Sequence, residues 1–492
     1  MRQKTAFDLA LPPRDLQKSP SRWLYEAVRV GILEGHLRPG ARLPATRDLG
    51  RQYELARGTI VNAFDQLKAE GYLDSSAGSG TYVSKILPDE FLRVSQKNLS
   101  EQVAATKPQR TFSDYGRRLK QFPNFELRPS RAFRTNVPAL DLFPANIWAQ
   151  VAARRLRRVS MNDLLVCDPL GYPPLRQALA GYLSTSRGVR CVAEQIAIVS
   201  GAQEAIDLAA RLFLNPGDRV CVESPGYPGA AIAFKAVGAK ISGIPVDEEG
   251  VKVHPSTLQN AKLVYVTPGH QFPLGVTMSL QRRLHLLDYA AKSGTIIIED
   301  DYDSEYRYIG SPIPALQGLD RHGSVVFIGS FSKVLFPSLR LGYLVIPDDL
   351  ADHISAMLSV TSRHAPLLEQ AILCDFISEG HFGRHLRRMR EIYAERLSVL
   401  LHSARQSLPG LLEISCVEAG LQTTGLLRGG INSEAAASAA AQRNVEVTPL
   451  SRYSQGSTTT PEGLQLGFAA TNAQEIRRGV RELAIALTSV KA

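Results

Sequence analysis

The segment SFSKVLFPSLR, residues 330–340, places Lys333 after two hydroxyl side chains, Ser330 and Ser332, and ahead of Arg340. A lysine amine can form a Schiff base with an aldehyde. Hydroxyls and a guanidinium can hold a phosphate beside that amine. Because the segment follows the apolar run SVVFIG, it predicts a site at the end of a strand for a ligand that carries both an aldehyde and a phosphate.

A second run, GTIIIEDDY at residues 294–302, brings carboxylates to the end of another apolar strand. Such a carboxylate can pair with a pyridinium nitrogen and keep the ring an electron sink. The amine, the anion site and the carboxylate together predict pyridoxal 5'-phosphate as the cofactor. Asp301 and Asp303 crowd Asp300, so the residues alone leave open which carboxylate meets the nitrogen.

The composition bounds the class of protein. The 492 residues predict two or three domains, and the hydrophobic and charged fractions, 44% and 21%, are typical of globular proteins. No apolar run approaches the roughly 20 residues that span a bilayer, and the N-terminus lacks the apolar core of a signal peptide. The five cysteines form no C-x-x-C pair, so neither a metal site nor a disulfide framework is predicted. We expect a cytoplasmic protein without a membrane segment.

The net charge of +10 is concentrated near the N-terminus. Residues 1–86 hold 13 Lys and Arg against 9 Asp and Glu, a difference of +4, and residues 87–130 hold 8 against 5, a difference of +3. A basic head on a nearly neutral body indicates a polyanionic partner, although a solvated surface explains a modest asymmetry as well.

Residues 17–85 predict a small α+β domain. Apolar residues recur on one face of a helix over residues 23–37, which a Pro-Gly pair ends. Shorter helices follow over residues 46–53 and 57–70, and residues 71–83 predict two strands around a glycine-rich turn. Three short helices before a hairpin make a winged helix-turn-helix.

The third helix and the hairpin form the predicted DNA surface. The helix can enter a major groove and present Arg57, Thr59 and Asn62 to base edges or phosphates. The glycine-rich wing lets backbone N–H groups approach phosphate through Ser79, Gly80 and Thr81. The alternative is a protein-interaction module with ordinary surface arginines.

Three segments carry a family resemblance in this head: LPATRDL, ARGTIVNAFDQLKAEGYL and GSGTYV. In this order they resemble the GntR family of DNA-binding domains. The resemblance implies DNA contacts from Arg47, Arg57, Thr59 and Gly80. Ala56 departs from the family, which places a helix-capping serine there, and losing that cap costs about 1 kcal/mol.

The rest of the chain predicts a linker and an α/β body. Residues 86–130 show no sustained apolar period and predict a long connector, with structure returning near Phe112. In residues 131–492, apolar strand-like runs alternate with helical stretches, which predicts a mostly parallel sheet covered by helices. The string SGAQEA at 200–205 opens a helix whose N–H groups can bind phosphate. In ESPGYPG, Tyr227 offers a flat surface for a pyridine ring.

This arrangement resembles the type I fold of pyridoxal-phosphate-dependent transferases, with a large, mostly parallel-sheet domain and a small C-terminal domain over roughly 366–492. Joined to the GntR-like head, the chain resembles the MocR family of transcriptional regulators, which the string HQFP at 270–273 supports. The resemblance implies that Lys333 binds the cofactor as an aldimine, Asp300 pairs with the pyridinium nitrogen, Tyr302 bonds the phenolic oxygen and Tyr227 stacks on the ring. It assigns the phosphate to Ser330, Ser332, Arg340, Gly201, Ala202 and Gln203.

Three functions remain in view. The first is a DNA-binding regulator that senses a small amine or amino-acid effector, or the cofactor itself, as a homodimer to which the loop GYPPLR at 171–176 contributes. The second is an aminotransferase with an appended DNA-binding domain, and the third is a DNA-binding protein whose body has lost the cofactor. Phe272 stands where aminotransferases place an asparagine, and Gln465 aligns with their carboxylate-binding arginine. Both positions argue against efficient turnover, although Arg452 offers another cation.

Overall fold

The computed structural model describes residues 9–14, 18–76, 80–87, 110–119, 131–165, 167–308, 310, 313–455 and 460–491. The chain divides into two compact units, residues 1–111 and residues 112–492. The division falls within the predicted linker of residues 86–130, most of which lies outside the described residues. Structure returns with the short helix α5, Asp114–Arg118.

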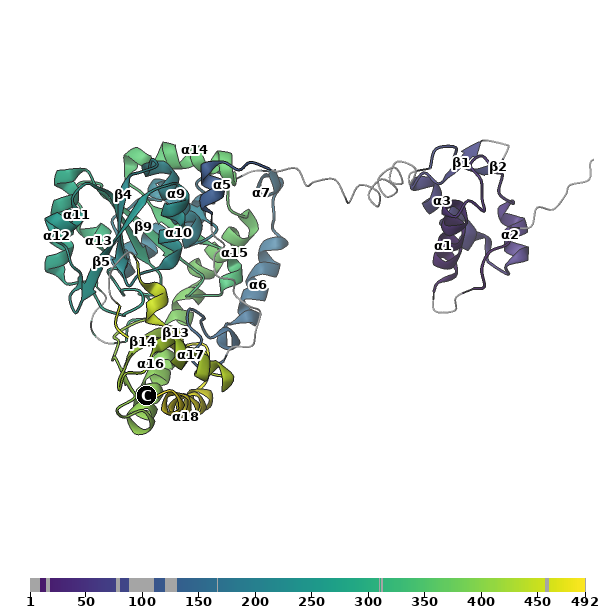
Figure 1. The fold of residues 1–492 in the computed structure, drawn as a ribbon. Helices are drawn as coiled ribbons and strands as arrows, with labels where there is room; N and C mark the ends of the chain where they lie inside the picture. The colour runs from purple at the N-terminus through teal and green to yellow at the C-terminus, as the bar shows by residue number, and fades with distance from the viewer. Residues whose placement is uncertain are drawn as a thin grey trace, which may run out of the picture. The chain divides into compact units, whose positions relative to one another are not determined.

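The N-terminal unit is a winged helix-turn-helix (Figure 1). Its elements are α1 (Pro20–Leu33), α2 (Thr46–Gln52), α3 (Arg57–Ala69), β1 (Leu73–Ser76) and β2 (Gly80–Val83). The two strands pair antiparallel, with Leu73 opposite Val83. The apolar faces of the three helices meet in one core, which holds Leu24, Val28, Leu49, Ile60 and Phe64.

The first helix is shorter than the predicted span of residues 23–37. It begins earlier because the Ser19 side chain caps it and Pro20 occupies its first position. It ends at Leu33 because Gly35 takes a left-handed backbone conformation, with φ of 79°. Leu37, expected to be helical, instead folds back so that its N–H donates to the carbonyl of Gly31 at 2.8 Å.

Within the described part of the second unit, eight strands form one sheet in the order β3-β10-β9-β8-β7-β4-β5-β6. The pairs among β9, β8, β7, β4 and β5 are all parallel, while β10 and β6 run antiparallel to their neighbours. The strands are β3 (Ile196–Val199), β4 (Arg219–Ser224), β5 (Lys240–Asp247), β6 (Gly250–Val251), β7 (Ala261–Val266), β8 (Ile296–Asp301), β9 (Val325–Ser330) and β10 (Gly342–Val345).

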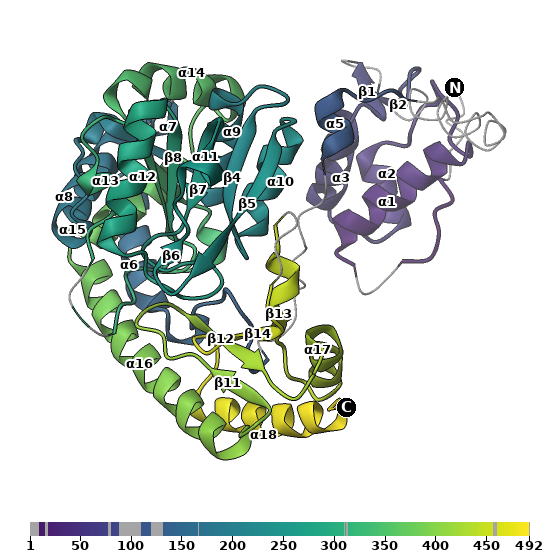
Figure 2. The same cartoon turned by 60° about the vertical axis from the view of Figure 1, so that its left-hand side comes forward.

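Helices cover both faces of this sheet (Figure 1, Figure 2). Successive strand residues point to opposite faces, so Ile298 packs in the core beneath α9, α10 and α14, whereas Ile297 packs in the core beneath α12. The helices of this domain are α6 (Ala145–Leu156), α7 (Met161–Leu165), α8 (Pro173–Arg187), α9 (Ala202–Phe213), α10 (Pro228–Ala236), α11 (Pro255–Leu258), α12 (Leu280–Ser293), α13 (Leu316–Leu319), α14 (Ala351–Thr361) and α15 (Leu367–Ser378).

The small domain follows the long helix α16 (His381–Ser407), which leads from the large domain toward α18 in Figure 2. Its antiparallel sheet has the order β11-β12-β14-β13 and packs with α17 and α18. These elements are β11 (Leu412–Ile414), β12 (Gln422–Leu427), α17 (Ser433–Gln442), β13 (Thr448–Pro449), β14 (Gly463–Gly467) and α18 (Ala473–Ser489).

The segment at residues 131–136 joins the small domain, although it lies far away in sequence. Ala132 bridges to Val445 and Phe133 bridges to Gly467. The small domain therefore includes chain that precedes the large one, which the predicted span of roughly 366–492 omits. The predicted fold class is confirmed: a winged helix-turn-helix is joined to a type I transferase fold.

Candidate cofactor site and nucleic-acid interface

Lys333 follows β9 and is half-buried. Its Nζ donates a hydrogen bond to the carbonyl of Asn136 at 2.7 Å. Withdrawal of the amine from water lowers the pKa of Lys333 to about 8, and the nearby carboxylates of Asp303 and Asp300 oppose that fall. With a pKa of about 8, roughly a tenth of the amine is unprotonated at pH 7, and the unprotonated form attacks an aldehyde.

Asp300 lies at the end of β8 and is 5% exposed. Its Oδ2 accepts a hydrogen bond from the hydroxyl of Tyr265, and its Oδ1 has no partner among the described residues. Burial raises the pKa of Asp300 to about 7. A buried carboxylate with one unpaired oxygen fits a protonated ring nitrogen, because that cation would restore the charge that burial disfavours.

The other two carboxylates of this run have different partners. Asp301 forms an ion pair with Arg187, whose Nε donates to Oδ2 at 2.7 Å. Asp303 Oδ1 lies 2.8 Å from His270 Nδ1. Asp300 thus has no ion pair among the described residues. The sequence, which shows three neighbouring aspartates, does not reveal this difference between them.

The predicted phosphate residues converge at the N-terminus of α9. The Ser330 hydroxyl accepts from the N–H of Ser332 at 3.2 Å. Gly201 precedes the helix with φ of 124°, and a Cβ built on it would lie 3.7 Å from Nη1 of Arg340. The guanidinium therefore stands beside free N–H groups at the positive end of a helix dipole, a combination that fits a phosphate.

Gln203 and Ala202 lie in the first turn of α9. The Gln203 side chain is engaged, because its Nε2 donates to the carbonyl of Gly229 at 3.0 Å and its Oε1 accepts from the Tyr227 hydroxyl at 3.3 Å. These two residues can therefore offer an anion only their backbone, and the Gln203 side chain instead holds the Tyr227 hydroxyl.

An aromatic cluster closes this side of the site. Phe272 packs edge-on against Tyr227, Tyr302 and Tyr453, with ring centroids 5.7, 5.8 and 5.1 Å away. The Tyr302 hydroxyl lies 3.0 Å from His270 Nδ1. Phe272 therefore presents only hydrocarbon to the three tyrosine rings on this side of the site.

Several residues of this site were absent from the predicted set. Tyr265 holds Asp300, Asn136 holds Lys333, and the pair His270–Asp303 positions Tyr302. His270 was visible in the HQFP string and Asp303 in the acidic run, but sequence gives no sign that they meet. Asn136 could not be found, because only the folded chain brings it beside β9.

The predicted DNA surface divides between exposed and half-buried groups. Arg47, Arg57 and Asn62 are exposed on α2 and α3, whereas Thr59 is half-buried. Ala56 makes no side-chain cap at the start of α3. Exposed arginines at the beginnings of two adjacent helices suit phosphate contact.

The wing adds a further basic group. Gly80 has φ of 118°, and a Cβ built on it would lie 3.0 Å from Nε of Arg42, an exposed arginine that sequence reasoning missed. Arg42 bridges to Tyr82 of β2, so it belongs to the hairpin. Thr81 is half-buried, and Ser79 lies outside the described residues.

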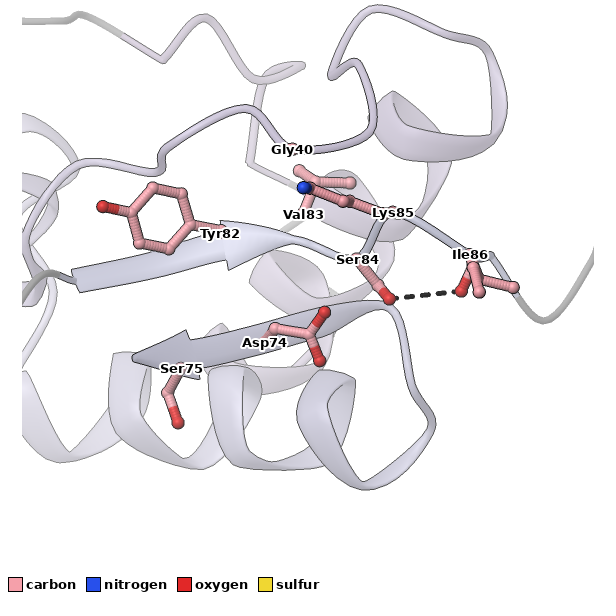
Figure 3. A pocket seen from close by; sticks show the side chains of 8 residues that line it. All are labelled: Gly40, Asp74, Ser75, Tyr82, Val83, Ser84, Lys85 and Ile86. Atoms are coloured by element: carbon pink, nitrogen blue, oxygen red, sulfur yellow. Dashed lines mark hydrogen bonds between the residues drawn. The ribbon is translucent and has the colours of Figure 1, made fainter. Parts of the chain in front are cut away.

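A shallow hollow lies beside the hairpin (Figure 3). Asp74, Tyr82 and Lys85 line it, and Ser84 donates to the carbonyl of Ile86 at 3.1 Å. Its lining includes no described residue of α3, so it is separate from the predicted base-reading surface.

No described helix is long and apolar enough to cross a membrane. The described residues also hold no group of three or more His, Cys, Asp or Glu side chains arranged to bind a metal ion.

The chain thus joins a helix-turn-helix head to a body that carries the residues of a pyridoxal-phosphate site, a combination that defines a class of transcriptional regulators. The family models agree with both parts: residues 20–83 match bacterial regulatory proteins of the gntR family, and residues 134–483 match aminotransferase class I and II. The chain belongs to the MocR-type transcriptional regulators, which combine these two domains.

Two similar regulators span nearly the whole chain, and a solved aminotransferase matches the body. A probable rhizopine catabolism regulatory protein, MocR, from Rhizobium meliloti is 39% identical over 480 residues, which cover 97% of this chain and 96% of that protein. A pyridoxine biosynthesis transcriptional regulator from Corynebacterium glutamicum is 28% identical and covers 98% of both chains. The crystal structure of an α-aminoadipate aminotransferase from Thermus thermophilus, complexed with N-(5'-phosphopyridoxyl)-L-leucine, is 28% identical with a TM-score of 0.71 and covers 77% of this chain and 97% of that one.

Proposed function

We propose that the protein is a cytoplasmic transcriptional regulator in which a small amine or amino acid, or the cofactor itself, changes DNA binding by the head. The cofactor is pyridoxal 5'-phosphate, which supplies an aldehyde and an electron-withdrawing ring. The observation that carries this proposal is the unpaired Oδ1 of Asp300 near an amine of lowered pKa. Lys333 would bind the aldehyde, Asp300 the ring nitrogen and Arg340 the phosphate.

The remaining roles belong to neighbouring side chains. Tyr227 would stack on the ring in the orientation that Gln203 sets. Tyr302 would donate to the phenolic oxygen, since the Nδ1–H of His270 is directed to Asp303 and leaves the tyrosine proton for another acceptor. Phe272 and Tyr453 would exclude water beside the ring.

A homodimer is part of the proposal. The short helix α7 exposes Met161, Leu164 and Leu165 by 76%, 61% and 74%, a concentration of apolar surface that is typical of protein interfaces. Residues 171–176, which by resemblance reach the neighbouring subunit, form a loop only as far as Tyr172, because α8 begins at Pro173. Two heads per assembly would contact two half-sites on DNA.

The cofactor arm of the proposal is tested by absorbance. Full-length protein mixed with pyridoxal phosphate should gain the visible absorbance of the covalently held cofactor, and Lys333→Ala should not. Lys292→Ala is the matched control, because Lys292 is exposed on α12 and paired with Asp288. A wild-type protein that stays colourless at saturating cofactor would refute the assignment.

The DNA arm is tested by gel shift on the intergenic DNA upstream of the gene. The double variant Arg47→Ala, Arg57→Ala should keep the cofactor absorbance and lose binding. The double variant Lys18→Ala, Arg22→Ala changes the charge equally but removes residues that pair with Glu26 on α1, so it should bind DNA like wild type. Equal DNA binding by both double variants would refute the placed surface.

Transamination is the second candidate, and the complete set of cofactor residues favours it. Steady release of keto acid from amino donors by the wild type would support an enzyme, whereas DNA binding that responds to an amine without release supports the regulator.

A further inference from the structure

The small domain places a group of uncharged polar side chains beside the segment that holds Lys333. The Tyr453 hydroxyl donates to Oε1 of Gln465 at 2.7 Å, and the hydroxyls of Thr135 and Thr448 lie within hydrogen-bonding reach of the same tyrosine. We call these four residues the neutral polar group. Thr135 immediately precedes Asn136, whose carbonyl accepts from Lys333.

The neutral polar group has one unsatisfied member. Gln465 lies on β14 and is 0% exposed, and its Nε2 has no hydrogen-bond partner among the described residues. Its place is fixed by strand pairing with Thr424 and Thr448 and by the bond from Tyr453. An unpaired buried amide is costly, so the arrangement calls for a partner atom on a ligand.

The same group borders the aromatic cluster of the cofactor site. The Tyr453 ring lies 5.1 Å from Phe272, which contacts Tyr227 and Tyr302. The neutral polar group therefore adjoins the cofactor site on two sides, through Asn136 and through Phe272.

The arginines close to this group in sequence are already engaged. Arg134, which precedes Thr135, lies 3.7 Å from a carboxylate oxygen of Glu446. Arg452, which precedes Tyr453, donates to both carboxylate oxygens of Glu434, at 3.0 and 2.6 Å, and is 58% exposed. A carboxylate placed against Gln465 would lose its hydration without gaining a free cation from either of these two arginines, which is unfavourable.

We infer that the effector is an amine whose remaining polar groups are uncharged, hydroxyl or carbonyl, one of which pairs with Gln465. This inference rests on the proposed function, because it assumes that the amine meets the cofactor. Because Oε1 of Gln465 already accepts from Tyr453, the open atom is the Nε2 donor, and a hydroxyl or carbonyl oxygen of the ligand can accept from it. Amines that carry a carboxylate bind poorly.

The test compares pairs of amines that differ only in replacing CH2OH by a carboxylate. Ethanolamine against glycine, serinol against serine, and glucosaminitol against glucosaminic acid are titrated into the full-length protein loaded with pyridoxal phosphate. The readout is the absorbance change of the bound cofactor, which gives a dissociation constant. We expect the alcohol of each pair to bind at least tenfold more tightly. Equal or tighter binding of the acids overturns the inference, as does a cofactor that no compound perturbs.

Variants locate the selectivity. Gln465→Arg supplies a cation at the same place and should shift the ratio of alcohol affinity to acid affinity at least tenfold toward the acids. Tyr453→Phe keeps the shape, releases Gln465 and should weaken the alcohols severalfold without improving the acids, which keeps the test open if the arginine variant does not fold. Arg452→Gln should change neither affinity, and loss of tight acid binding in it would overturn the inference by identifying Arg452 as the clamp.

The two proposals fail differently in this experiment. A wild-type protein without cofactor absorbance overturns both of them. Retained absorbance and DNA binding, together with a preference for acids, overturn only the inference about the effector.

Discussion

Replacing Asp300 by asparagine should stabilise the cofactor-free protein and weaken cofactor binding. The carboxyl is 5% exposed and its pKa is raised from 3.8 to about 7 by burial. That rise corresponds to about 4 kcal/mol, because one pKa unit is worth about 1.4 kcal/mol. The asparagine can still accept from Tyr265, but its amide nitrogen inherits the unpaired position at a cost of about 1 kcal/mol. The net gain is about 3 kcal/mol.

The stability gained by replacing Asp300 with asparagine depends on pH. Below pH 3.8 the carboxyl is protonated in both the folded and the unfolded chain, so burial costs nothing. Between pH 3.8 and about 7 the unfolded chain loses the proton while the folded chain keeps it, so stability falls as the pH rises. Above pH 7 the full penalty applies. The advantage of Asp300→Asn is therefore largest at pH 8 and falls below half of that at pH 5.

The assay is urea unfolding of the cofactor-free protein. The chain has two tryptophans, and a Trp23→Phe background leaves Trp148, which packs against Phe336, as the reporter of the second unit. Glu299→Gln is the matched control: its pKa is also raised to about 7, but both oxygens accept backbone N–H groups, so an amide there should destabilise. A less stable Asp300→Asn at pH 8 would refute the reasoning.

Three further results are expected. The rate of cofactor uptake should rise with pH and level off above about 8, as Lys333 loses its proton, which stopped-flow absorbance measures. Gly201→Ala should lower cofactor affinity tenfold or more in an absorbance titration, because φ of 124° strains an alanine beside Arg340. Gly217→Ala is the control: with φ of 94° and open space around it, it should lower stability without changing cofactor affinity. Ala56→Ser should stabilise the head by about 1 kcal/mol in thermal unfolding, by capping α3.

The fold was accessible from sequence because its signals are local. Apolar strands with ligand motifs at their ends identify a parallel α/β domain, and three short helices before a hairpin identify the head. Helix ends were less accessible: α1 stops where Gly35 turns left-handed, and the Pro-Gly pair a few residues later gave the stronger signal. The contact of residues 131–136 with the small domain has no local signature, because it depends on how distant segments meet.

The acidic run at the end of β8 shows why the site could be predicted only in part. Alternation along the strand can place Asp300 and Asp301 on opposite faces, but it does not say what each face holds. The fold supplies Arg187 for Asp301 and His270 for Asp303, and leaves Asp300 with one tyrosine and one unpaired oxygen.

The same partition explains how one site tolerates three carboxylates. Asp301 is neutralised by the permanently charged Arg187. Asp303 is hydrogen-bonded to His270 and also accepts from the N–H of Leu421 in the small domain, the latter at 3.3 Å. Among these three aspartates, Asp300 alone has no cationic partner among the described residues. Its pKa near 7 lets Asp300 hold a proton when no cofactor is bound, and a bound pyridinium would favour the ionised carboxylate. Asp303, in contrast, is hydrogen-bonded to both domains. A shift of the small domain at Leu421 would therefore change the positions of His270 and Tyr302, next to which the cofactor's phenolic oxygen is expected.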